Sequence, residues 1–248
     1  MYAICTAAGI CYYSICGRRR KLPLAIVNNT SSNENTLILS YDGYTPASDE
    51  IIKENGTFSQ SLVPNSVADV PWNLTQNAVN NVKVYTGTNG EKIKPKSMAF
   101  WFRGAVYSGS LQGASKETLK NIDLTGLDTS GTESMAYLFS GDVALEKIAG
   151  LNSLDTSSVT DMTCMFNSCM KLSEIDVSNF NTSNVTSFEQ MFGWVDSEGT
   201  NQISNLDLSN FNTSKATNMH NMFLGLNVEE LNLKNFDTSS VTTMSMMF

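Results

Sequence analysis

The side chains that could carry chemistry in this sequence are one histidine, five cysteines and a series of regularly spaced aspartates. The histidine is His220, and no Ser-His-Asp or Cys-His set can be assembled around it for nucleophilic catalysis. The sequence also contains no glycine-rich phosphate loop and no Cys-x-x-Cys pair. We therefore predict that the protein is not an enzyme and uses no cofactor.

The aspartates could instead hold cations. Asp123, Asp176 and Asp207 recur at one position of a repeated pattern, and Asn232 completes the column. Carboxylate oxygens suit Ca²⁺, but neighbouring strands lie about 4.8 Å apart, and an irregular unit separates the first aspartate from the others. We favour carboxylates that accept hydrogen bonds from neighbouring serine and asparagine groups, and we predict no metal site.

The methionines and two of the cysteines could ligate a metal or haem, or could pack in a core. Eight of the 12 methionines fall in columns of the same pattern: Met135, Met162, Met165, Met191, Met219, Met222, Met244 and Met247. A flexible thioether fills irregular gaps between repeats, so we favour packing. Cys169 is interpreted as a buried thiol, although a disulfide with Cys164 stays possible if their Cα atoms lie within about 7 Å.

The pattern that must position these residues is a repeat. An Asp/Asn-Thr-Ser triplet is followed, ten positions after its first residue, by Met-Phe or Leu-Phe. The triplets begin at Asp128, Asp155, Asn181, Asn212 and Asp237, so successive starts lie 27, 26, 31 and 25 residues apart. A fixed interior with a joint of variable length predicts a solenoid, whose units stack on their neighbours.

Each unit changes its hydrophobic period at the triplet. In residues 172–192, Ile175, Val177 and Phe180 follow the period of a short strand. The next apolar residues, Val185, Phe188, Met191 and Phe192, have the spacing of one face of a short helix. Asp, Asn, Thr and Ser side chains cap helix starts. We therefore predict an α/β repeat fold, a leucine-rich-repeat-like solenoid with one short strand and one short helix per unit.

The chain divides into four parts on these patterns. Residues 1–21 form an apolar leader, and residues 22–81 form a β-rich N-terminal cap in which LPLAIV and TLILSY pair as a hairpin. Residues 82–118 form a degenerate capping repeat, with Trp101-Phe102 in place of Met-Phe. Residues 119–248 form five units of the solenoid. We expect the last unit to be truncated, so that further repeats follow it.

The leader and the overall charge indicate where the protein could be located and which partners it could bind. Its apolar run precedes Arg18–Lys21, whereas a secretory signal carries its positive charge first, and it is short for a membrane span. A wrongly assigned start, a partial gene and a short anchor remain alternatives. The net charge of −8 and the pI of about 4.7, without a Lys/Arg cluster in the repeats, argue against nucleic-acid binding.

The units LSEIDVSNFNTSNVTSFEQMF and ISNLDLSNFNTSKATNMHNMF resemble the BspA-like leucine-rich-repeat surface proteins. The resemblance extends over residues 93–248 and more weakly from residue 24. It implies a non-enzymatic protein that is displayed on the cell surface or secreted. It does not identify a ligand.

We expect function to lie on the concave sheet face and in the loops between repeats. The candidate residues are those between core positions of the strands, together with one loop tryptophan: Asp123, Thr125, Asp176, Ser178, Asp207, Ser209, Asn232, Lys234 and Trp194. The predicted role is adhesion to a protein or glycan on a host cell, matrix or neighbouring cell. The alternative is a spacer that displays another domain from the cell envelope. Membrane association is expected only through an anchor that the sequence does not clearly contain.

Overall fold

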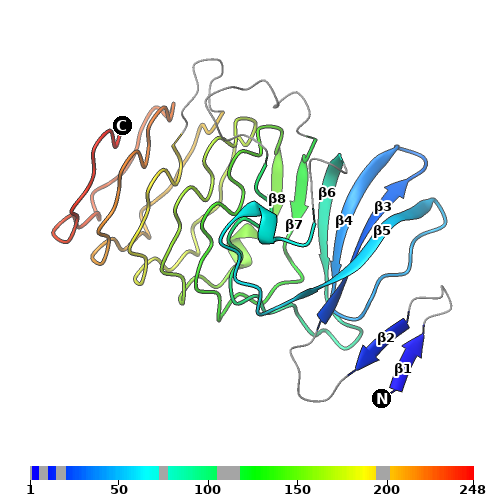
Figure 1. Ribbon diagram of the computed structural model, residues 1–248. Helices are drawn as coiled ribbons and strands as arrows, with labels where there is room; N and C mark the ends of the chain where they lie inside the picture. Colours follow the sequence, from blue (N-terminus) through cyan, green and yellow to red (C-terminus); the bar gives the residue numbers. More distant parts are fainter. Residues whose placement is uncertain (1, 6–10, 15–20, 73–77, 105–117, 194–201) are drawn as a thin grey trace.

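The computed structural model describes the whole chain except residues 1, 6–10, 15–20, 73–77, 105–117 and 194–201 (Figure 1). The described part is a mixed β structure without an α-helix, and its short 3-10 turns are Val67–Asp69 and Leu151–Ser153. The strands are β1 (Tyr2–Cys5), β2 (Cys11–Ser14), β3 (Lys21–Asn29), β4 (Glu34–Ser40), β5 (Glu50–Ser59), β6 (Val79–Tyr85), β7 (Asn121–Asp123) and β8 (Lys147–Ala149).

The main sheet changes from antiparallel to parallel along its width. Its strand order is β5-β3-β4-β6-β7-β8, and β1 pairs with β2 in a separate two-stranded sheet. The pairing of β3 with β4 is antiparallel, which confirms the predicted hairpin. From β4 onward each new strand is parallel to the last. β6 crosses the predicted boundary between residues 81 and 82, so one sheet joins the cap to the repeats.

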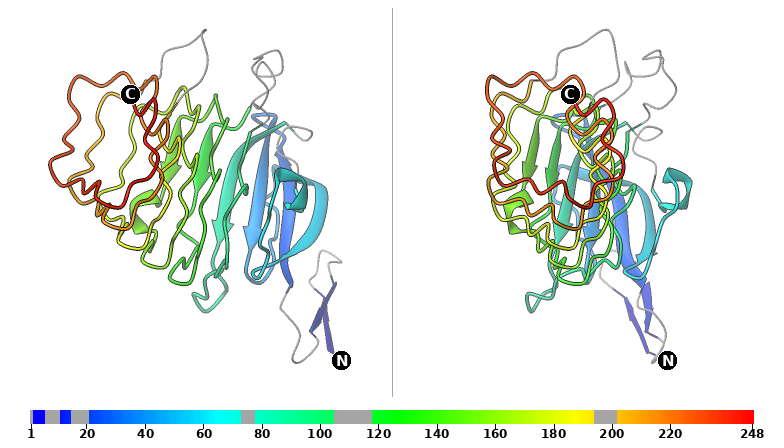
Figure 2. Two further views of the ribbon diagram at one scale, coloured as in Figure 1. Left: turned by 60° about the vertical axis from the view of Figure 1, so that its left-hand side comes forward. Right: turned by 90° about the vertical axis from the view of Figure 1, so that its left-hand side faces the viewer.

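Beyond β8 the repeat units continue as single bridges rather than long strands. One series of parallel bridges runs through Ser134, Asp161, Ser187, Asn218 and Thr243, one residue from each unit. Figure 1 shows these units side by side in chain order, with the C-terminus at the end away from β5. In the end-on view of Figure 2 their outlines overlap. Equivalent residues of successive units therefore face each other.

The prediction of one short helix per unit is wrong. A helix needs its amide groups to bond within the segment, whereas here they bond to the next unit. Cys164 N–H donates to Glu189 O at 2.8 Å, and Phe166 N–H donates to Met191 O at 2.9 Å. The backbone hydrogen bonds are thus those of a ladder between units.

The misleading helical spacing comes from a turn that precedes each doublet. Leu138 N–H donates to Met135 O at 3.2 Å, and the residue before the doublet has a left-handed backbone. This is the geometry of a type II turn, which requires positive φ at its third residue. It recurs in six units: Phe100, Tyr137, Cys164, Gln190, Asn221 and Met246. A turn of this kind brings residues three apart to the same side, as one turn of helix would.

The doublet phenylalanines form one continuous stack through the core. Consecutive ring centroids lie 5.4–6.2 Å apart, with interplanar angles of 5–22°. The stack comprises Phe102, Phe139, Phe166, Phe192, Phe223 and Phe248. Phe102 belongs to the cap unit, which confirms that Trp101-Phe102 takes the place of Met-Phe. Phe248, at the end of the stack, is 70% exposed.

The methionine columns pack beside this stack. Seven of the eight methionines singled out above are buried, and Met244 of the last unit is exposed. The apolar surface that they remove from water is the main source of stability for such an array. Their position in the core supports the packing interpretation.

The central threonines of three triplets connect neighbouring units through buried hydroxyls. Thr182 Oγ1 donates to Asn212 O at 2.9 Å and accepts from Asn212 N–H at 2.8 Å. Thr156 makes the same pair of bonds to Asn181, and Thr213 makes them to Asp237. The first residue of each triplet bonds the amide two residues later, as with Asn181 and Ser183. The triplet therefore closes a corner and joins two units, and it does not cap a helix.

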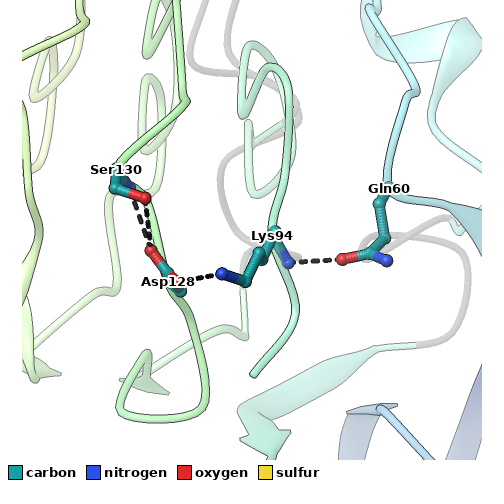
Figure 3. A network of polar contacts seen from close by, with 4 residues as sticks. All are labelled: Gln60, Lys94, Asp128 and Ser130. Atoms are coloured by element: carbon teal, nitrogen blue, oxygen red, sulfur yellow. Dashed lines mark hydrogen bonds and ion pairs between the residues drawn. The ribbon is translucent and has the colours of Figure 1, made fainter. Parts of the chain in front are cut away.

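A polar network joins the cap to the first repeat (Figure 3). Lys94 N–H donates to Gln60 Oε1 at 2.5 Å, and Lys94 Nζ lies 2.7 Å from Asp128 Oδ2. Asp128 Oδ1 also accepts from Ser130 N–H and Ser130 Oγ. The hydrogen bond from Lys94 is the main cause that lowers the pKa of Asp128 to about 2.

This lowered pKa predicts an acid-dependent loss of stability. An aspartate in the unfolded chain has a pKa of about 3.9. Because the folded value is lower, the contribution is present above about pH 4 and is lost as the pH falls through about 2. We expect stability, measured by urea unfolding between these pH values, to fall more steeply in the native protein than in Asp128→Asn. Asn181 shows that asparagine supports the same corner.

Asp155→Asn is the matched control for this prediction. Asp155 opens the next triplet and bonds Ser157 in the same way, but within the described part of the chain no lysine or arginine pairs with it. Equal pH slopes for Asp128→Asn and the native protein would show that the ion pair does not contribute.

Candidate functional site

The candidate residues of the repeats alternate with buried residues in the first segment of their units, in line with β7, and we call the surface that they form the strand face. Core residues alternate with them, since Ile122, Leu124, Ile175 and Val177 are buried. Asp123 is half-buried, and the remaining candidates are exposed: Thr125, Asp176, Ser178, Asp207, Ser209, Asn232 and Lys234. Eight of the nine predicted residues thus occupy half-buried or exposed positions of the strand face. Trp194, the ninth, lies outside the described residues.

The acidic column of the strand face is built from local turns. Asp123, Asp176 and Asp207 each use Oδ1 to accept from the backbone amide two residues later, at 2.9–3.2 Å. Asn232 makes the same bond to Lys234. These bonds account for the Asp/Asn preference at the position, because both side chains stabilise this turn.

Hydrogen bonds lower the pKa of two of these carboxylates. The Ser178 hydroxyl is the main cause that lowers the pKa of Asp176. Asn152, from the irregular unit, also donates to Asp176, at 2.9 Å. The backbone amide of Ser209 is the main cause that lowers the pKa of Asp207. The strand face therefore carries fixed negative charges, held by the serine and asparagine partners that the sequence suggested.

The strand face extends further toward the cap than the sequence indicated. In β6, Val82 and Val84 are buried while Lys83 and Tyr85 are exposed, so the latter two point to the strand face. Asn121 Nδ2 donates to Asn81 Oδ1 at 2.9 Å, which places β6 and β7 side chains on the same side. The alternation of apolar and polar residues in Val82-Lys83-Val84-Tyr85 could have indicated from the sequence that Lys83 and Tyr85 face outward. These two residues were missed because the strand precedes the first triplet, which marks where the repeats begin.

The nucleophile candidates lie away from the strand face. Burial raises the pKa of the Cys164 thiol to about 12 and that of Cys169 further above its ordinary value. Both thiols are free and buried, as favoured over a disulfide, and a protonated thiol is a poor nucleophile. His220 is half-buried, and its Nδ1 lies 2.7 Å from Ser245 Oγ of the next unit.

The described residues contain neither a metal-binding cluster nor a membrane-spanning helix. No group of three or more His, Cys, Asp or Glu side chains there could hold a metal ion. Within the same part of the chain, no helix has the length and apolar character needed to cross a membrane.

Comparison with known proteins identifies the repeats. The sequence pattern of the family described as "Mycoplasma protein of unknown function, DUF285" matches residues 108–198 and again residues 195–248. Together these matches span more than half of the 248 residues. The chain belongs to this family. DUF285 is generally known as a surface-repeat-like family. No curated protein and no solved structure matches the chain.

The two DUF285 matches fit the repeat organisation. They meet at residues 195–198, in the longest joint between triplets. The strand face of the later units falls within the matches, as do all five triplets. Lys83, Tyr85 and the cap strands β3–β6 lie outside them.

Proposed function

We propose that this DUF285 protein is a surface-displayed or secreted repeat protein that adheres to molecules of a host cell, matrix or neighbouring cell. The strand face is the proposed binding surface. The observation that carries the proposal is the row of exposed side chains at equivalent positions of successive units, with the carboxylates of Asp176 and Asp207 oriented by turn hydrogen bonds. Fixed groups lose little freedom on binding, which favours affinity.

We also propose that the repeat units form a solenoid. The inter-unit bonds, the threonine connections and the phenylalanine stack support a solenoid related to the BspA-like leucine-rich-repeat proteins. In this array the second segment of each unit is a turn and a bridge instead of a helix. Solenoids commonly bind through the extended face formed by their repeated strands.

A spacer that displays another domain is the second candidate function. It is favoured by the continuous packing of the units, because a row of stacked rings and paired backbones resists bending. A spacer does not depend on the chemistry of its exposed columns. Substitutions on the strand face therefore discriminate between the two functions.

The test removes charge from the strand face without removing its turns. Asparagine holds the equivalent turn at Asn232, so Asp176→Asn with Asp207→Asn should leave thermal unfolding nearly unchanged. A charge-assisted hydrogen bond contributes about 1.5–3 kcal/mol, and about 1.4 kcal/mol is tenfold in affinity. We expect the double variant to bind immobilised extracellular matrix or intact cells at least about tenfold more weakly.

The matched control is Asp237→Asn. Asp237 accepts from Ser239 N–H at 2.9 Å in a turn of the same kind, and Ser239 lowers its pKa too. It stands in the corner column, away from the strand face. Unchanged binding by the double variant, or an equal loss in Asp237→Asn, would argue against the strand face as the adhesive surface.

A further inference from the structure

Tyr85, the last residue of β6, places an aromatic ring on the strand face. Its side chain is 36% exposed, and its ring centroid lies 5.3 Å from that of Tyr44, at an interplanar angle of 38°. The Tyr44 hydroxyl donates to the Glu50 carboxylate, and burial together with this bond raises the pKa of Tyr44. Tyr44 is therefore held against Tyr85, which positions the exposed ring.

Two groups of opposite charge stand beside this ring. Lys83 precedes Tyr85 by two residues in β6, so both side chains point to the same face. Asp123 of β7 is paired with Lys83 in the parallel register. Adjacent positions of this kind lie about 5–7 Å apart. Lys83 thus lies next to Tyr85 along β6, and Asp123 lies next to Lys83 and diagonally from Tyr85, about 7–8 Å away. One ammonium donor and one carboxylate acceptor therefore lie on the same side of a single aromatic ring.

Asp123 has an oxygen available for a ligand. Its Oδ1 accepts from Thr125 N–H at 3.0 Å and from Thr125 Oγ1 at 2.7 Å. Among the described residues, no group donates to Oδ2, although a carboxylate oxygen can accept two hydrogen bonds. The turn therefore orients the carboxylate while half of its accepting capacity remains unused.

We infer that Tyr85, Lys83 and Asp123 form a subsite for one pyranose ring of a glycan. This rests on the proposed adhesive function and narrows its ligand class. The C–H groups on one side of a pyranose carry a small positive charge and stack on the negative face of an aromatic ring. Hydroxyls around the sugar both donate and accept, so a carboxylate and an ammonium serve them together.

A protein partner fits this surface less well. Among the described residues, the exposed large apolar or aromatic side chains are Ile51, Val63, Tyr85, Met244, Met246 and Phe248. Of these, Tyr85 alone stands in the rows of the strand face. A protein interface is centred on a desolvated apolar core. Here one exposed ring rests on Tyr44 and has polar groups on its other side, which suits a ligand that offers both C–H and hydroxyl groups.

The test uses the full chain and two probes. The first is a set of immobilised oligosaccharides that end in hexose, N-acetylhexosamine or sialic acid. The second is extracellular matrix before and after mild periodate oxidation, which cleaves the vicinal diols of sugars. We expect binding to at least one oligosaccharide and loss of matrix binding after oxidation.

The variants distinguish the contribution of the Tyr85 ring to binding from that of its hydroxyl group and from that of any exposed apolar side chain. Tyr85→Phe keeps the stacking face and should bind as the native protein does. Tyr85→Leu should weaken binding by about tenfold, and Asp123→Asn should weaken it while keeping the turn. Ile51→Ala is the matched control, because Ile51 is 58% exposed and its strand neighbour Ile52 packs against the cluster beside Tyr44. Thermal unfolding confirms that each variant is folded.

The outcomes distinguish this inference from the proposed function. Binding to none of the oligosaccharides, or full binding by Tyr85→Leu, overturns the glycan subsite. If matrix binding also survives periodate but falls in Asp176→Asn with Asp207→Asn, the adhesive function stands with a protein ligand. If the chain binds neither probe, both proposals are wrong.

Discussion

Phe166→Ala is expected to lower the free energy of unfolding by about 3–5 kcal/mol, the usual cost of removing a buried phenylalanine. Phe166 is fully buried in the middle of the ring stack, 5.4 Å from Phe139 and 5.7 Å from Phe192. Its removal leaves a cavity and breaks the stack into two parts. Phe139 and Phe192 then have no ring between them, so the units on either side lose this core contact. Urea unfolding followed by circular dichroism measures the loss.

Phe248→Ala is the control from the same column. Phe248 stacks on Phe223 at 5.7 Å, but it is 70% exposed, so its truncation removes little buried surface. We expect a change below about 1 kcal/mol, as for most exposed positions. Similar losses for Phe166→Ala and Phe248→Ala would mean that the continuous stack does not hold the units together.

The sequence predicted the repeat and its core because both depend on spacing. A doublet ten positions after each triplet must reach the same place in every unit, and the ring stack confirms that it does. The same argument extended to Trp101-Phe102 in the cap. It failed for the helix because spacing does not report where amide groups bond. Left-handed residues such as Gln190 (φ 51°), which a bulky side chain adopts at a cost, could not be read from the pattern.

Part of the candidate site was predicted from the sequence, again because spacing within the repeats marks equivalent positions. Alternation in the strands separated Asp176 and Ser178 from their buried neighbours, so the acidic and serine columns were found. Tyr85 and Lys83 were missed as site residues because β6 carries no triplet to mark its register. Only the parallel pairing of β6 with β7 places Lys83 beside Asp123. Long-range pairing of this kind lies beyond local sequence patterns.

The second large effect is expected at the buried threonines of the corners. Thr182→Val keeps the shape of the side chain but removes the hydroxyl that bonds both the amide and the carbonyl of Asn212. These two backbone groups, which are partly buried, then lose their partner. An unsatisfied buried polar group costs about 1–3 kcal/mol, so we expect the free energy of unfolding to fall by about that amount.

Thr129 offers the sharpest comparison, because its hydroxyl is buried and has no hydrogen-bond partner among the described residues. The following unit reaches its triplet through the 3-10 turn Leu151–Ser153, and the reciprocal pair that Thr182 makes is not formed there. Thr129→Val therefore removes a polar atom that gains nothing from burial, and it should leave stability unchanged or raise it. The same substitution at the same position of two units is thus expected to lower the free energy of unfolding at Thr182 and not to lower it at Thr129. Equal destabilisation at both positions would show that the threonine matters for its shape, and the corner hydrogen bonds would then contribute little to the stacking of the units.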